Sequence, residues 1–214
     1  MRTIRNVVVL IFVVGCCGVN AQPVKLTHYV FNSFQQGKVK VKSGVTSEQT
    51  LNYNILTNEM IFDDAGRMMA IGNAANVDTV YIQGRKFVPA EGKFYELLTN
   101  TLLPLLLEFT ATTEAPTASV GYGNASKATN ATSISKLVKS GNVYGLKLPD
   151  DFKVIPGFTF RILKAGKYEK AGSAKQLGSI FPEQKKRISE LIRKNDTRFF
   201  NRNDLIKLVL KIQA

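Results

Sequence analysis

Histidine, cysteine and tryptophan are scarce in this sequence. Its 214 residues include one His, two Cys and no Trp, and 16 acidic side chains stand against 29 basic ones. One histidine excludes a zinc site built from several imidazoles, and a Ser-His-Asp triad would have to use His28. Because His28 lies close to the N-terminus, we expect it to be a structural or exposed residue rather than a catalytic base.

A short apolar run lies near the N-terminus, behind two arginines. Arg2 and Arg5 precede Val7–Gly15, and the small, turn-prone residues 16–21 follow this run. Its nine residues are too few for a membrane-spanning helix, which needs about 20 apolar residues. A basic start, a short apolar run and small residues in this order are typical of a secretory signal peptide.

The predicted cleavage site follows Ala21. Val19 and Ala21 occupy positions −3 and −1 of a V-x-A site, so we expect residues 1–21 to be removed and Gln22 to become the N-terminus. The protein is therefore predicted to be exported, and to be periplasmic, outer-membrane-associated or secreted. Cleavage also removes both cysteines, Cys16 and Cys17, which leaves the mature chain without a disulfide or a thiolate metal site.

The same segment supports a second interpretation. Val13-Val14-Gly15-Cys16 resembles a bacterial lipobox, in which Cys16 would be acylated and become the first residue. An acyl anchor would hold the protein on a membrane face without crossing it. Under both interpretations no transmembrane segment is expected in the mature chain.

Residues 22–109 show the pattern of an antiparallel β body. Strand-like segments recur about every ten residues and are separated by polar turns. Hairpins are predicted over Met60–Ile71, Val80–Val88 and Phe158–Tyr168. The predicted fold class is α+β and mainly β: an antiparallel meander, sandwich or barrel-like body followed by a C-terminal helical hairpin.

A segment of different composition follows this body. In residues 110–135, 18 of 26 residues are Ser, Thr, Ala or Gly. Such a segment buries little apolar surface to offset its ordering entropy, so we predict a mobile loop. Further strands are predicted over residues 136–172, beginning with Val143–Leu148.

Helical periodicity appears in residues 173–214. Pro182 suits a first helical turn, and Asn203 is a good N-cap for a second helix. We therefore predict a basic helical pair joined by residues 195–202. The apolar residues that share one face of the first helix are Phe181, Ile188, Leu191 and Ile192.

Positive charge is concentrated toward the C-terminus. Residues 22–140 hold 11 basic and 9 acidic side chains, net +2, whereas residues 141–214 hold 16 and 7, net +9. The sum, +11, is the net charge of the chain once Arg2 and Arg5 have been removed. The densest basic residues lie on or next to the first predicted helix and are Lys185, Lys186, Arg187, Arg193, Lys194 and Arg198.

These basic residues have two interpretations. A solvated helix face that keeps the protein soluble gives the same pattern. The functional interpretation is contact with an anionic envelope component, which is a lipid head group, a phosphorylated glycan or an acidic protein. Nucleic acid is not expected as a partner, because an exported protein meets little of it and no aromatic residues interleave with the basic ones.

The sequence contains no clear catalytic motif, and no cofactor or metal is expected. The first hypothesis is therefore a non-enzymatic binding module, and the alternative is a glycan-acting enzyme with paired carboxylates, which meet only in the fold. A third hypothesis is a structural role, in which an exposed strand edge pairs with a strand of a partner. The candidate carboxylates of the enzyme hypothesis are Glu59, Asp63, Glu91, Glu96 and Glu108.

Several stretches of the chain resemble a pattern that recurs in one group of exported proteins. In the β body these stretches are Leu51–Leu56 with Glu59 and Phe62, Val77–Val80 and Phe87-Val88. Nearer the C-terminus they are Leu146–Phe152, Ile180–Lys186 and Asp204–Leu208, with Asn195 and Phe199 between the last two. Together they resemble uncharacterised exported β-rich proteins of Bacteroidota-type bacteria. The resemblance implies an envelope or secreted location and a β-rich body with a helical end, and it carries no activity over to any residue.

Overall fold

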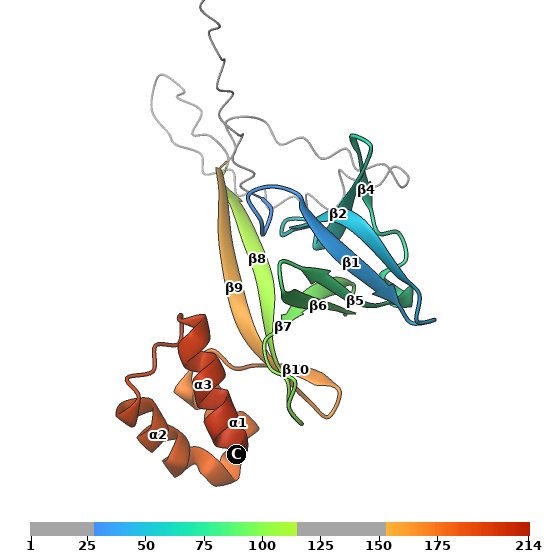
Figure 1. Cartoon of the computed structure of the whole chain (residues 1–214). Helices are drawn as coiled ribbons and strands as arrows, with labels where there is room; N and C mark the ends of the chain where they lie inside the picture. Colours follow the sequence, from blue (N-terminus) through green and yellow to red (C-terminus); the bar gives the residue numbers. More distant parts are fainter. Residues whose placement is uncertain (1–27, 115–152) are drawn as a thin grey trace, which may run out of the picture.

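The structure is a computed structural model that describes residues 28–114 and 153–214 (Figure 1). The predicted signal peptide, its cleavage between Ala21 and Gln22, and the lipidation alternative at Cys16 lie outside the described residues. The predicted strand over Val143–Leu148 and residues 115–135 of the predicted loop lie outside them as well.

The described residues form one open antiparallel sheet of ten strands, followed by a helical part (Figure 1). The strand order is β10-β9-β8-β7-β6-β5-β1-β2-β3-β4, so β10 and β4 are the two edges and the sheet is not closed. The predicted α+β, mainly β class with a helical C-terminal end is confirmed. The strands are β1 (Gln35–Val41), β2 (Thr46–Asn54), β3 (Glu59–Asp64), β4 (Arg67–Ala70), β5 (Val77–Ile82), β6 (Arg85–Ala90), β7 (Lys93–Leu97), β8 (Leu105–Glu114), β9 (Lys153–Lys164) and β10 (Lys167–Lys170).

All three predicted hairpins are confirmed, as β3–β4, β5–β6 and β9–β10. Each is closed by a two-residue turn in which both residues have positive φ, as at Ala165 (49°) and Gly166 (76°). Positive φ at both positions is the type I′ geometry, whose twist matches the right-handed twist of the flanking strands.

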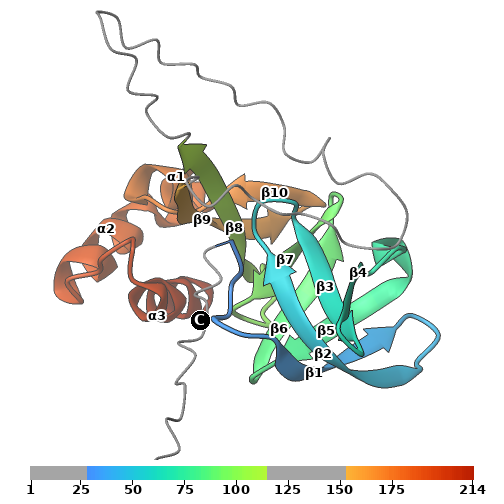
Figure 2. The same cartoon turned by 90° about the horizontal axis from the view of Figure 1, so that it is seen from above.

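The two longest strands, β8 and β9, connect the β body with the helices (Figures 1 and 2). Their ladder extends from Leu105↔Ile162 to Glu114↔Lys153. The prediction that a loop begins at residue 110 is therefore wrong for residues 110–114, which form the end of β8. Amino-acid composition gave the wrong prediction here because these residues pair with β9, 39 to 47 residues away in the sequence, and because Ala111 packs against the core of the β body.

Gly37 in β1 lies where two backbones approach closely. A Cβ added at Gly37 would lie 2.5 Å from the carbonyl oxygen of Tyr81 in β5 and 3.0 Å from a methyl carbon of Leu51 in β2. Since that oxygen cannot move without disturbing the β1–β5 ladder, we expect Gly37→Ala to lower the free energy of unfolding by about 2 kcal/mol. Urea denaturation measures this change. Gly172→Ala is the matched control with an expected effect near zero, because its nearest neighbour would lie at 3.7 Å; an unchanged midpoint for Gly37→Ala would contradict the packing argument.

The residues that the structure describes form two hydrophobic cores. The β core lies within the curved body and comprises Phe31, Val39, Leu51, Tyr53, Ile55, Met60, Val77, Val80, Ile82, Phe87 and Phe94. The helical core lies between the helices and β8–β9 and comprises Leu105, Leu107, Phe160, Ile162, Ala171, Leu177, Ile180, Phe181, Ile188, Leu205, Leu208, Val209 and Ile212. Phe109 of β8 packs against both cores, so the helical part and the β body share one apolar interior.

The helical part contains three α-helices rather than the predicted pair. They are α1 (Ala174–Ile180), α2 (Lys185–Lys194), which follows a 3₁₀ turn over Pro182–Gln184, and α3 (Arg202–Gln213). The sequence pattern missed α1 because seven residues are too few to show a helical stripe. The predicted cap of the last helix is also corrected, since Asn201 and not Asn203 is the N-cap: its Oδ1 accepts hydrogen bonds from the backbone N–H groups of Asn203 and Asp204.

Candidate functional site

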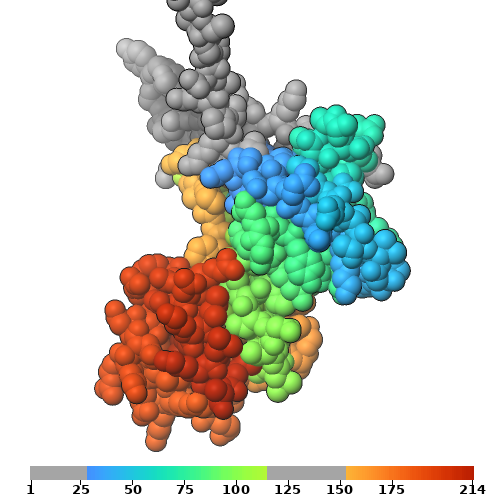
Figure 3. Space-filling model, in the orientation of Figure 1, coloured from blue at the N-terminus to red at the C-terminus, as the bar shows by residue number. Residues whose placement is uncertain are grey.

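The six basic residues singled out in the sequence all lie on the surface of the helical part, which forms a lobe beside the β body (Figure 3). Five of them belong to α2, where Ile188 is buried and Leu191 and Ile192 are half-buried against the helical core. This apolar stripe turns Lys186 and Arg193 outward, because they lie about half a turn away from it. The predicted exposure of these side chains is thus explained by the way α2 packs.

Two of the six have structural partners. The Arg187 guanidinium donates to the carbonyl oxygen of Lys211 at 2.8 Å and thereby joins α2 to the C-terminal end of α3. Arg198 pairs with Asp204, with 3.2 Å between its Nε and the Asp204 Oδ2. The backbone N–H and the guanidinium of Arg198 together hold the pKa of the Asp204 carboxyl below its usual range. Arg187 and Arg198 therefore help to hold the helices together.

The other four side chains, Lys185, Lys186, Arg193 and Lys194, are exposed, and they make no hydrogen bond or ion pair with the residues that the structure describes. We call these four the basic face. Lys186 and Arg193 are seven residues apart, which places them about 10 Å apart along the helix axis. Glu190 is the one acidic residue of α2. The basic face thus extends along one short helix, with Lys186 and Arg193 on one side of it and Lys185 and Lys194 about a quarter turn to either side of that pair.

The two buried candidate carboxylates of the enzyme hypothesis do not converge. Glu96 on β7 and Glu108 on β8 are buried, but the pairs Glu96↔Leu107 and Tyr95↔Glu108 place them on opposite faces of the sheet. A glycosidase needs two carboxylates that flank one bond of the substrate, so this pair cannot do that work.

Each buried glutamate is held by two cations. Glu96 accepts hydrogen bonds from Arg85, at 2.9 and 2.6 Å, and from Arg202 at the start of α3. Glu108 accepts hydrogen bonds from Lys93 and from Arg161, the latter at 2.7 Å. Burial alone would raise the pKa of Glu108, but these two hydrogen bonds and the positive charges behind them lower it more, so its net pKa lies below the usual value. Both carboxylates therefore act as structural anions.

Asp63 and Glu91 are also engaged in local structure, whereas the Oε2 of Glu59 is buried without a hydrogen-bond partner among the described residues. Asp63 accepts from the backbone N–H of Gly66 at 2.7 Å in the β3–β4 turn. Glu91 accepts from the Tyr95 hydroxyl at 2.7 Å. Burial and this hydrogen bond raise the pKa of the Tyr95 phenol, which keeps it protonated. Glu59 is half-buried at the start of β3.

Neither of the two pockets described in this structure holds two of these carboxylates. The larger contains no acidic residue, and the smaller, of about 160 Å³ between α2 and α3, contains only Asp204. Neither pocket therefore supplies the two carboxylates that a glycosidase site needs.

His28 is a structural residue of the β body. Its carbonyl oxygen accepts from the backbone N–H of Ile55 at 3.0 Å, and burial lowers the pKa of its imidazole. In residues 28–114 and 153–214 there is no group of three or more His, Cys, Asp or Glu side chains placed to hold a metal ion. None of the helices in these two ranges has both the length and the apolar composition to span a bilayer.

Comparisons of this chain with protein-family models, with curated proteins and with solved structures found no match.

The sequence pattern identified the basic face, but it identified neither the apolar pocket of the β body nor the ion pairs of Glu96. Both are made by residues from several strands, and no local motif marks them.

Proposed function

We propose that this protein is an exported, non-enzymatic binding module that attaches to an anionic surface of the cell envelope through the basic face of α2. The observation that supports this most directly is the exposure of Lys185, Lys186, Arg193 and Lys194 without internal partners. If these residues had a structural role, they would form ion pairs within the protein, as Arg198 does with Asp204. Charges that remain unpaired are available to a ligand.

The shape of the basic face favours an extended surface over a single small anion. Its cations follow one helix over about 13 Å, and none of the four lines either of the two described pockets. Phosphate-bearing lipid head groups present many anions in one plane and match cations that are spread along a helix. Near an anionic leaflet each basic residue contributes about 1 kcal/mol of attraction.

Vesicle binding tests this proposal. Lys186→Gln, Arg193→Gln and Lys194→Gln in one variant remove three charges and leave Ile188, Leu191 and Ile192 of the stripe in place. We expect about 100-fold weaker binding to phosphatidylglycerol vesicles at low salt, from about 1 kcal/mol for each charge. Binding of the unaltered protein is also expected to weaken as salt rises, because the screening length falls to about 10 Å at 0.1 M ionic strength.

The matched control removes three charges elsewhere. Lys42, Lys167 and Lys170 are exposed and lie outside the three helices, so their replacement by Gln changes the net charge equally. An equal loss of binding in this control would show that net charge alone acts, and would contradict the proposal. Binding of the unaltered protein to phosphorylated envelope glycan but not to the vesicles would contradict the lipid surface as the partner.

A further inference from the structure

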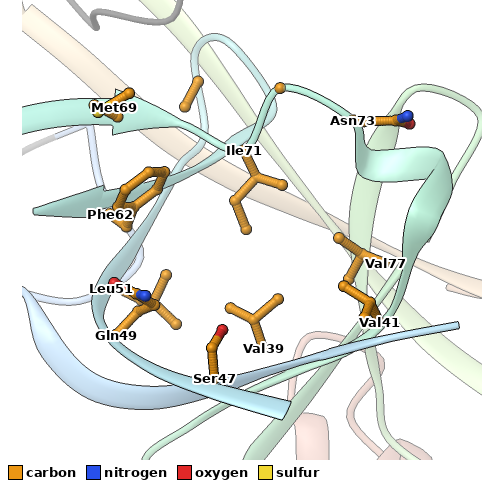
Figure 4. Close-up of a pocket in the computed structure, with 12 residues that line it drawn as sticks. Val39, Val41, Ser47, Gln49, Leu51, Phe62, Met69, Ile71, Asn73 and Val77 are labelled. Atoms are coloured by element: carbon orange, nitrogen blue, oxygen red, sulfur yellow. The ribbon is translucent and has the colours of Figure 1, made fainter. Parts of the chain in front are cut away.

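The β body contains an open apolar pocket of about 330 Å³ (Figure 4), on strands that lie away from α2 in Figure 1. Five strands and the connection from β4 to β5 surround it. The lining side chains come from β1 (Val39, Val41), β2 (Ser47, Gln49, Leu51), β3 and β4 (Phe62, Met69, Ala70), the connection (Ile71, Gly72, Asn73) and β5 (Val77). In Figure 4 the side chains of Val39, Val41, Leu51, Phe62, Ile71 and Val77 surround a common space.

The strand register explains why these side chains converge. Val39 pairs with Ser47, Val41 with Val77, and Phe62 with Met69. Paired residues point to the same face of a sheet, so the concave face collects all of them. Because the walls are fixed by ladder hydrogen bonds, the pocket cannot close by a local shift of side chains, and it is formed before any ligand arrives.

Exposure changes from the floor of the pocket to its mouth. Leu51 and Val77 at the floor are buried, and Phe62 and Ile71 in the walls are half-buried. The mouth is polar, and its outer edge is exposed. Ser47, Gln49 and Asn73 supply the polar atoms of the mouth, and their side chains make no hydrogen bond with the residues that the structure describes. No charged side chain lines the pocket.

We infer that this pocket binds an uncharged amphiphile, with its aliphatic chain on the floor and its polar head at the mouth. Apolar walls with a few polar groups are the usual make-up of a small-molecule site, and such sites begin at about 300 Å³. An apolar cavity of about 150 Å³ holds benzene, with six carbons, so 330 Å³ has room for about a dozen non-hydrogen atoms. A chain of about ten carbons with a hydroxyl head has this size and finds its hydrogen-bond partners in Ser47, Gln49 and Asn73.

A titration with primary alcohols of increasing length tests the inference, with 1-decanol as the principal probe. Methyl-resolved NMR of the full chain follows the Val, Leu, Ile and Met methyl groups. Decanol is expected to shift the methyl signals of Val39, Leu51 and Ile71 and to leave those of Ile188 and Ile212 in the helical core unchanged. Affinity is expected to rise about fourfold for each added methylene and to level off near ten carbons, where the pocket is full.

Two variants change the size of the pocket in opposite directions. Val41→Phe fills part of it, and losing room for two methylenes predicts about 15-fold weaker decanol binding and a plateau at shorter chains. Met69→Ala enlarges the pocket and moves the plateau to longer chains. Val45→Phe makes the same substitution as the first variant at an exposed position outside the lining, and decanol binding is expected to be unchanged.

Unchanged signals of the helical core show that each variant is folded. If Val41→Phe unfolds the protein, Met69→Ala still tests the dependence on chain length. The inference is overturned if decanol leaves the pocket methyl groups unshifted, or if folded pocket variants keep the chain-length profile of the unaltered protein. Loss of vesicle binding in the basic-face variant leaves this titration unaffected, so the two sites are tested separately.

Discussion

Replacing Glu96 by alanine is expected to lower the free energy of unfolding by about 3 kcal/mol. The Glu96 side chain is 0% exposed, and it is held by Arg85 of β6 and by Arg202 at the first turn of α3. Removing one partner of a buried ion pair is costly because the other charge is left without compensation. The expected loss is at the lower end of the usual range, since Arg85 and Arg202 are 23% and 40% exposed and regain some hydration.

The surroundings of Arg85 prevent a rearrangement that would avoid this loss of stability. Its guanidinium carbon lies 4.9 Å from the ring centroid of Phe31 and 5.3 and 5.4 Å from those of Phe87 and Phe109. These rings hold the cation at the junction of the β core with β8, where the Glu96 carboxylate neutralises it. Without Glu96 the guanidinium either stays unpaired among the rings or moves toward water and leaves a gap.

The Glu96–Arg202 pair also ties the helical part to the sheet across 106 residues of sequence. Urea denaturation measures the overall loss of stability in Glu96→Ala, and hydrogen exchange of the α3 backbone shows whether the N-terminal end of α3 loosens. We expect faster exchange at Leu205 and Leu208 than in the unaltered protein.

Glu48→Ala is the matched control for Glu96→Ala. Glu48 also pairs across neighbouring strands, with Lys38 at 3.2 Å, but the two side chains are 72% and 60% exposed. An exposed pair of this kind contributes less than about 0.5 kcal/mol. Equal stability losses in Glu48→Ala and Glu96→Ala would contradict the assignment of Glu96 as the structural anion of this junction.

Replacing Glu108 by glutamine is expected to cost about 2 kcal/mol near neutral pH, the size of charge-assisted hydrogen bonds that are lost. Lys93 and Arg161 would then face each other across a neutral amide. Because the folded protein lowers the pKa of Glu108, its stabilising contribution is full above the unfolded value of about 4.3 and is lost as pH falls through the folded value.

The stability difference between the unaltered protein and Glu108→Gln is therefore expected to be largest near neutral pH and to shrink in acid. Urea denaturation of both proteins at about pH 7 and about pH 2.5 measures it, since the linkage acts between these values. Other carboxylates titrate in both proteins and cancel in the difference. A difference that is the same at both pH values would show that Glu108 does not contribute as an anion.

Periodicity in the sequence predicted the structure correctly where the contacts that determine it are local. The hairpins at Gln83-Gly84 and Ala165-Gly166 were predicted because two-residue turns and alternating flanks lie next to each other in the chain. The outward position of Lys186 and Arg193 followed from their offset from the apolar stripe of α2. Both depend on repeats of 2 or about 3.6 residues, which a single segment contains in full.

Amino-acid composition gave a wrong prediction where pairing with a segment distant in the sequence determines the secondary structure. Residues 110–114 are as poor in apolar side chains as the loop they were assigned to, yet they are a strand because β9 supplies their hydrogen bonds. The short helix α1 shows no apolar stripe in the sequence. It packs through Leu177 and Ile180 into the helical core, which also contains residues of the sheet.

The sequence by itself determined that this protein is mainly β, ends in helices and carries free cations on one helical face. Only the tertiary structure decided that Glu96 meets Arg202, that Glu96 and Glu108 point to opposite faces, and that several strands surround an empty apolar pocket. The reason is that secondary structure depends on residues close together in the chain. Ion pairs and pockets depend on residues that come together only when strands and helices distant in the sequence pack against each other.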